Sequence, residues 1–221
     1  MKIHIAESKY WRTLPATFLP EYKAEIKKAY QEVTKLLPFG SRRINFFVQP
    51  RTYGLIEATG DSARTHNSEF IELAFDPTRK GKDLDVIMSG VQLGVFHEMN
   101  HAARWHKLID HKTFLDNCVM EGLATAFARD YADEKALWGD YPAEVTNWLQ
   151  EIIDKNDMFS WSNYSFTHPD GRKWIAYKVG TYIIDQAKHN SGKSVIELTQ
   201  LECAEILKLA KINVKNYHSL A

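Results

Sequence analysis

The sequence predicts an α+β protein with a small N-terminal sheet, antiparallel or mixed, packed on a mainly helical core. Three short runs rich in β-branched and aromatic residues lie between positions 42 and 77. From position 84 onward, apolar residues recur mostly at helical spacing. No repeat or Gly/Ser-rich linker interrupts the 221 residues, so we expect one domain over 1–221, with the helix and sheet in 1–83 and the helical part in 84–221.

The first predicted element is an amphipathic helix over residues 19–37, with Pro20 at its start and PFG after its end. Three strand-like runs follow: RRINFFVQP (42–50), YGLIEATG (53–60) and SEFIELAFDP (68–77). The last run is either an ordinary strand of the sheet or an edge strand that pairs with an extended peptide.

The helical part begins near Leu84 and runs into GVFHEMNHAARWH (94–106). A second helix is predicted over Phe114–Tyr131, where Gly122 inside the pattern indicates close packing against a neighbour. Three later segments have helical periodicity, and a polar, aromatic loop over 158–171 separates the first two. These segments are 142–155, 172–190 and 194–211.

The composition is that of an ordinary globular protein, with 28 basic and 28 acidic side chains. This balance gives no overall field that would attract nucleic acid or an anionic membrane. The sequence has neither a signal-peptide core nor an apolar stretch long enough to cross a bilayer, so we expect a cytoplasmic protein. Cys118 and Cys203 lie far apart without a CxxC spacing, and we expect both to be reduced.

The segment HEMNH contains the chemistry-bearing motif HExxH. Four helical residues turn about 400°, so His97 and His101 project from one face about 6 Å apart and can share one cation. Glu98 is one position further round the helix, where it can accept a proton from a water bound to that cation. The alternative is an amphipathic helix whose histidines face solvent or bond to each other.

A catalytic zinc usually has three protein ligands, and the candidates for the third are His106, Asp110, His111 and Glu121. On a continuous helix, His106 lies about 140° from His101 and cannot reach the same ion. His111 falls in a loop and is a weaker candidate than Glu121.

Glu121 lies twenty residues after His101 on the next predicted helix, which leaves room for a reversing loop. Its surroundings, CVMEGLATAFA, are apolar, and an unpaired carboxylate buried there would cost several kcal/mol. A bound cation removes that cost. The alternative is a carboxylate at the helix edge that pairs with arginine.

The metzincin class is excluded by spacing, because Arg104 and Lys107 stand where that class has a glycine and a third histidine. HEMNH followed by EGLATAFA instead resembles the gluzincin zinc peptidases. It more closely resembles an uncharacterised family of predicted zinc-dependent proteases that pair an HExxH helix with an EGLA helix. The resemblance spans roughly residues 86–131.

This resemblance implies a zincin-like core, with zinc bound by His97, His101 and Glu121 and with Glu98 as the catalytic base. One departure is Thr125, because some gluzincins have an aspartate four residues after the ligand glutamate that orients a histidine. We expect another group to orient the histidines here. The candidates are Asn117, Asp116 and a backbone carbonyl.

The function expected is zinc-dependent hydrolysis of peptide bonds in a peptide or protein substrate. A donor for the oxyanion is needed, and Tyr177 is the first candidate, followed by His168 and Tyr182. Two alternatives are a non-catalytic protein-binding scaffold of the same fold and a metal-dependent hydrolase of another bond. An intact Glu98 favours an enzyme, since a structural zinc site has no use for a base aimed at water.

Overall fold

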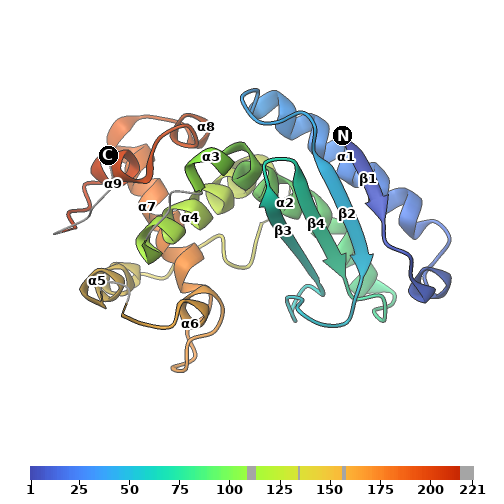
Figure 1. Ribbon diagram of the computed structural model, residues 1–221. Coiled ribbons are helices and arrows are strands. Elements are labelled where there is room, and N and C mark those ends of the chain that lie inside the picture. The colour runs from blue at the N-terminus through green and yellow to red at the C-terminus, as the bar shows by residue number, and fades with distance from the viewer. Residues whose placement is uncertain (109–112, 134, 156–157, 215–221) are drawn as a thin grey trace. The chain divides into compact units, whose positions relative to one another are not determined.

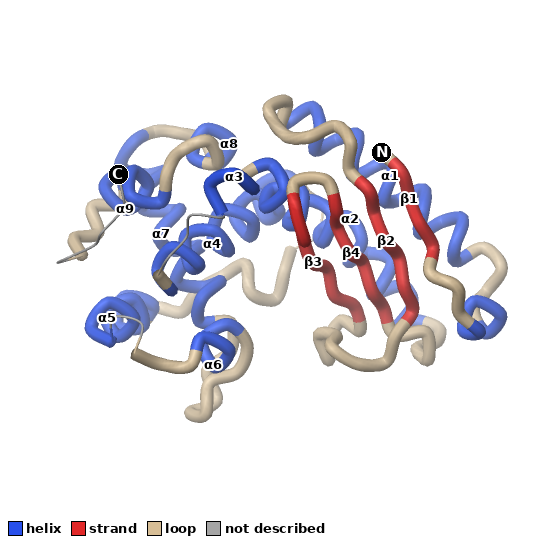
Figure 2. The backbone as a smooth tube through the Cα atoms, in the orientation of Figure 1, coloured by secondary structure: helices blue, strands red, loops and turns tan. Residues whose placement is uncertain are grey.

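The computed structural model describes residues 1–108, 113–133, 135–155 and 158–214 (Figure 1). Contacts divide the chain into two units: Met1–Trp105 with Tyr131–Glu134, and His106–Asp130 with Lys135–Ala221. The predicted α+β class is confirmed, with a four-stranded sheet in the first unit and mainly helices in the described part of the second (Figure 2). The single domain over 1–221 stays a prediction.

The sheet of the first unit is mixed, in the order β1-β2-β4-β3. β2 pairs in parallel with β1 and β4, and β3 pairs antiparallel with β4. Two long helices and a short 3-10 helix complete this unit. The elements are β1 (Lys2–Ile5), η1 (Lys9–Thr13), α1 (Phe18–Leu36), β2 (Asn45–Pro50), β3 (Asp61–Asn67), β4 (Phe70–Phe75) and α2 (Lys82–Ala103).

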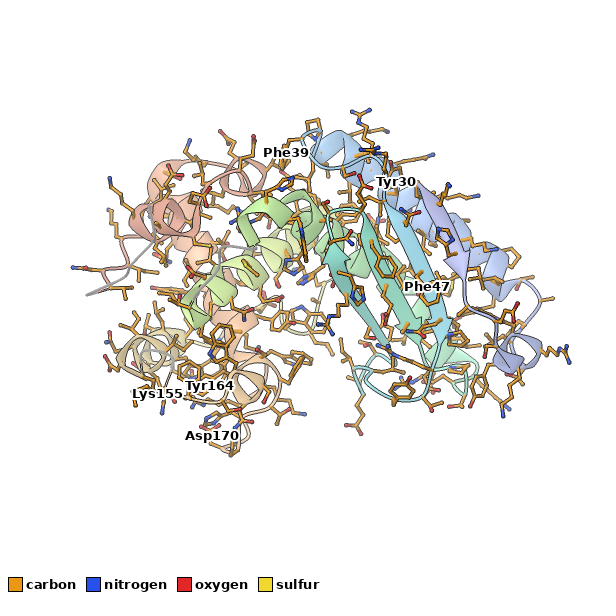
Figure 3. The ribbon with its side chains drawn as sticks, in the orientation of Figure 1. Tyr30, Phe39, Phe47, Lys155, Tyr164 and Asp170 are labelled. Carbon is orange, nitrogen blue, oxygen red and sulfur yellow. The ribbon has the colours of Figure 1, made fainter. Side chains whose placement is uncertain are left out.

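Helices α1 and α2 cover one face of this sheet (Figure 1). Because side chains alternate along a strand, Phe46 and Val48 of β2 are buried towards the helices. Rings from α1 pack on the same face, with Tyr30 at 6.4 Å from Phe46 between ring centroids. Phe47 is half-buried on the opposite face (Figure 3).

One predicted strand is absent from this unit, and two of its strands were not predicted. YGLIEATG (53–60) forms turns, which end where Gly60 has a φ of +75° and donates to the Ile56 carbonyl at 2.7 Å. The strand follows it as β3, DSARTHN, whose polar sequence hides the usual apolar alternation. The strand β1, KIHI, was not predicted either, although its apolar and polar residues do alternate.

SEFIELAFDP contains β4, but β4 is an interior strand with neighbours on both sides. Of the two interpretations of this run, the ordinary strand of the sheet is therefore confirmed. The edge strand that adds a peptide is wrong, since the backbone groups of β4 are already used within the sheet. The described sheet ends at β1 and β3 instead.

In the second unit, α7 contacts α5, α6, α8 and α9. The predicted segment 194–211 divides into α8 and α9, because Glu202 and Glu205 form a capping box that starts a new helix. The described helices of this part of the chain are α4 (Phe114–Tyr131), α5 (Val145–Lys155), α6 (Trp161–Ser165), α7 (Ile175–Ser191), α8 (Val195–Leu198) and α9 (Cys203–Leu209), and α3 (Trp105–Leu108) precedes them.

Gly122 of α4 lies directly against Gly180 of α7, as its position in an apolar helix predicted. A β-carbon on Gly122 would lie 2.1 Å from the Gly180 carbonyl carbon, and one on Gly180 would lie 1.9 Å from the Cys118 oxygen. The two backbones therefore meet where neither helix has a side chain.

No helix in the described ranges is both long enough and apolar enough to cross a bilayer.

Candidate metal centre

Small residues on α2 let this helix lie close to β3. Gly90 and Gly94 lie one turn apart, and β-carbons added to them would point at Asp61 and Ala63, respectively. Positions four residues apart on a helix are about 6 Å apart along its axis, and positions two residues apart on a strand are about 6.6 Å apart. The two spacings nearly match, so successive pairs of positions can face each other. Four residues further along α2 and two residues further along β3, Glu98 lies beside Thr65.

The imidazoles of His97 and His101 point at one another from the same face of α2. Their Nε2 atoms are 3.1 Å apart, with His101 buried and His97 half-buried. Ligand atoms of His97, His101 and the half-buried Glu121 of α4 all lie within 4.8 Å of one another. The described residues thus contain a three-residue group that could bind a metal ion.

The donor set fits zinc. Two histidines and a glutamate form a ligand set found in catalytic zinc sites, which keep one coordination position for water. Two nitrogens bound tetrahedrally at about 2.05 Å from zinc would be about 3.3 Å apart, close to the 3.1 Å between the Nε2 atoms.

Glu98 takes a different direction from its histidine neighbours. It is buried, and its Oε2 lies 2.8 Å from the hydroxyl of Thr65, which also lies 2.8 Å from the Glu98 backbone carbonyl oxygen. Thr65 was not predicted from the sequence, since strand pairing and helix packing bring it to α2. The spacing of Gly90, Gly94 and Glu98 along one face was the available signal.

Of the other candidate ligands, one lies within the described residues. His106 is exposed on α3. Asp110 and His111 lie outside the described residues.

The three candidate oxyanion donors have structural contacts of their own in the second unit. The half-buried ring of Tyr177 packs on Trp174 at 5.6 Å between centroids, and Tyr182 packs edge-on against Tyr141 at 5.5 Å. His168 Nδ1 lies 2.8 Å from Asp170. The choice of Tyr177 as the donor stays a prediction.

Two of the groups expected to orient the histidines, Asp116 and Asn117, lie on α4. Asp116 accepts a hydrogen bond from the Thr113 amide at 3.0 Å, which starts the helix. The Thr125 hydroxyl, one turn after Glu121, is buried and makes no hydrogen bond within the described part of the chain. A buried hydroxyl without a hydrogen-bond partner is unusual in a native protein.

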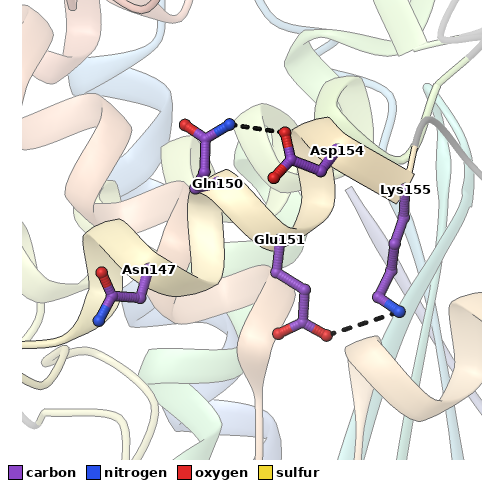
Figure 4. Close-up of a pocket in the computed structure, with 5 residues that line it drawn as sticks. All are labelled: Asn147, Gln150, Glu151, Asp154 and Lys155. Atoms are coloured by element: carbon purple, nitrogen blue, oxygen red, sulfur yellow. Dashed lines mark hydrogen bonds and ion pairs between the residues drawn. The ribbon is translucent and has the colours of Figure 1, made fainter.

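A second polar cluster lies on α5, where Asn147 and four other side chains line an open hollow (Figure 4). These groups bond to one another: Gln150 donates to Asp154 at 2.7 Å, and Lys155 lies 3.9 Å from Glu151. The hydrogen bond from Arg172 lowers the pKa of Glu151. Such mutual pairing is typical of a solvated helix face.

Asp170 gives a testable pH dependence. Hydrogen bonds from the Arg172 backbone amide, from His168 and from the Arg172 side chain lower the pKa of Asp170 to about 2. Because the folded pKa lies below the ordinary value of 3.8, the stabilisation is present above about pH 4 and is lost as the pH falls through 2. In thermal melts between pH 5 and pH 2, Asp170→Asn should lose less stability than the wild type. Equal slopes would contradict this expectation.

One family model, described as predicted Zn-dependent protease (DUF2268), matches residues 22–208 of the chain. The matched region includes α2 and α4 and most of the sheet. Neither a curated protein nor a solved structure matches the chain.

Proposed function

Because the chain belongs to the family described as predicted Zn-dependent protease (DUF2268), we propose that it is a zinc-dependent peptidase of the gluzincin class. The observation that carries the proposal is the group of His97, His101 and Glu121, whose ligand atoms lie within 4.8 Å of one another. Glu98, adjacent to the first histidine, supplies the base that hydrolysis requires.

His97, His101 and Glu121 would hold the ion, which would act as a Lewis acid and would make water a better nucleophile at neutral pH. The carboxylate of Glu98 takes a proton from the water that attacks the peptide carbonyl. It then delivers that proton to the leaving amine. Tyr177 donates a hydrogen bond to the carbonyl oxygen as negative charge develops on it.

The substrate is an extended peptide segment. β3 is an edge strand of the described sheet and has Thr65, the contact of Glu98, along its length. A peptide that adds to such an edge gains backbone hydrogen bonds with little dependence on sequence. β3 therefore replaces β4 as the strand to which we assign peptide binding.

Metal analysis of the purified protein beside Glu98→Gln tests the function. Both proteins should contain about one equivalent of zinc. Hydrolysis of a quenched fluorescent peptide library should fall about 10²- to 10⁴-fold in the variant, because the general base is lost. Glu57→Gln, which changes an exposed glutamate of the first unit, should match the wild type in both measurements.

The absence of zinc from the wild type after reconstitution would overturn the proposal. So would hydrolysis by Glu98→Gln at the wild-type rate. If zinc is bound and no peptide in the library is cut, the non-catalytic scaffold becomes the better interpretation.

A further inference from the structure

The contact between Thr65 and Glu98 joins a strand residue to the proposed base, 33 positions apart in the sequence. In register, Thr65 is opposite Ile71, which is fully buried, so the threonine side chain faces α2. The register of β3 shifts immediately after it, between Thr65 and Asn67. Bulges of this kind occur next to active sites, where they end regular pairing and direct a side chain.

The hydroxyl of Thr65 faces two acceptor oxygens of Glu98. It lies 2.8 Å from both the backbone carbonyl oxygen and the Oε2 atom of the glutamate. One hydroxyl proton serves one acceptor at a time, and both acceptors belong to the same residue. Within the described residues Oε1 has no hydrogen bond, so one carboxylate oxygen is held and the other is left for a water.

We propose that Thr65 is a positioning residue of the reaction, which holds the Glu98 carboxylate so that Oε1 faces the attacking water. This inference rests on the proposed peptidase function. A carboxylate on a flexible two-carbon stem has several rotamers, and holding it in the productive one avoids an entropic cost in the transition state.

A hydroxyl suits this role because it can donate to Oε2 both before and after Oε1 takes a proton. While Glu98 is ionised, Thr65 donates its proton to Oε2. When Oε1 has taken the proton of the water, Oε2 is the carbonyl oxygen of the resulting acid, and it still accepts the hydrogen bond from Thr65. The contact therefore persists through the proton transfer, with no proton gained or lost by Thr65.

Thr65→Val removes the hydroxyl and keeps the shape of the side chain. In the zinc-loaded enzyme, kcat should fall about 10- to 100-fold, while KM and the zinc content stay at their wild-type values. Thr65→Ser, which restores the hydroxyl, should recover most of the kcat. Thr199→Val, which removes another hydroxyl bonded to a backbone carbonyl, should leave kcat unchanged.

A second measurement needs neither zinc nor turnover. In zinc-free protein, Thr65→Val should lower the melting temperature more when Glu98 is present than in a Glu98→Ala background, because the contact with the carboxylate exists only in the former. Equal losses in the two backgrounds would overturn the inference.

The kinetic result separates this inference from the proposed function. If the wild type hydrolyses peptides, Glu98→Gln does not, and Thr65→Val has the wild-type kcat, the positioning role is wrong and the peptidase stands. If the wild type binds no zinc and cuts no peptide, the peptidase itself fails, and the inference fails with it.

Discussion

Gly122→Ala is expected to destabilise the protein by about 3 kcal/mol or more, at the upper end of the cost of overpacking. The new β-carbon would lie 2.1 Å from backbone atoms of Gly180, and no rotamer change can move a backbone away. The two helices would have to separate, which would open the packing of α4 on α7. Urea unfolding of the variant beside the wild type measures the change.

Gly94→Ala is the matched control. Its β-carbon would make an ordinary contact at 3.5 Å with Ala63, and alanine favours a helix over glycine by about 1 kcal/mol. This variant should be as stable as the wild type or slightly more stable. A large loss in Gly94→Ala, or none in Gly122→Ala, would contradict the close approach of α4 and α7.

His101→Ala and Glu121→Gln should each weaken zinc binding by about 100-fold or more. A four-ligand structural zinc site binds with about 10–16 kcal/mol, so each ligand contributes roughly 3 kcal/mol. Peptide hydrolysis should disappear with the metal. Competition against a chromophoric zinc chelator at fixed pH measures the affinity.

His106→Ala controls for the loss of any histidine near the site. His106 is five positions after His101 but is exposed on α3, so its removal should leave the zinc affinity unchanged. If His106→Ala loses zinc as strongly as His101→Ala, or if Glu121→Gln binds zinc normally, the assigned ligand set is wrong.

The long helices could be predicted from the sequence, because their periodicity is local. α4 has the predicted bounds, and α1 (Phe18–Leu36) differs from the predicted 19–37 by one residue at each end. β3 could not be predicted in the same way. The β3 side chains that point towards α2 lie against the glycines of that helix. Small and polar residues fit this narrow space, so the sequence of β3 has no apolar alternation.

The residues of the site also divide into those that local spacing reveals and those that only tertiary packing brings in. His97, Glu98 and His101 could be found from spacing on a single helix, and Glu121 stood out as a carboxylate in an apolar segment. Thr65 carried no such signal. Its importance depends on strand register and on how closely a helix approaches the strand, and both are set by residues distant in the sequence.

The strand order has a consequence for synthesis on the ribosome. β4 is translated after the other three strands, yet it takes the central position between β2 and β3. Until Phe75 has emerged, β2 and β3 have no common neighbour, and their backbone groups remain available to other chains. A nascent chain paused before this point exposes these two strand edges, whereas a few residues later the sheet can close.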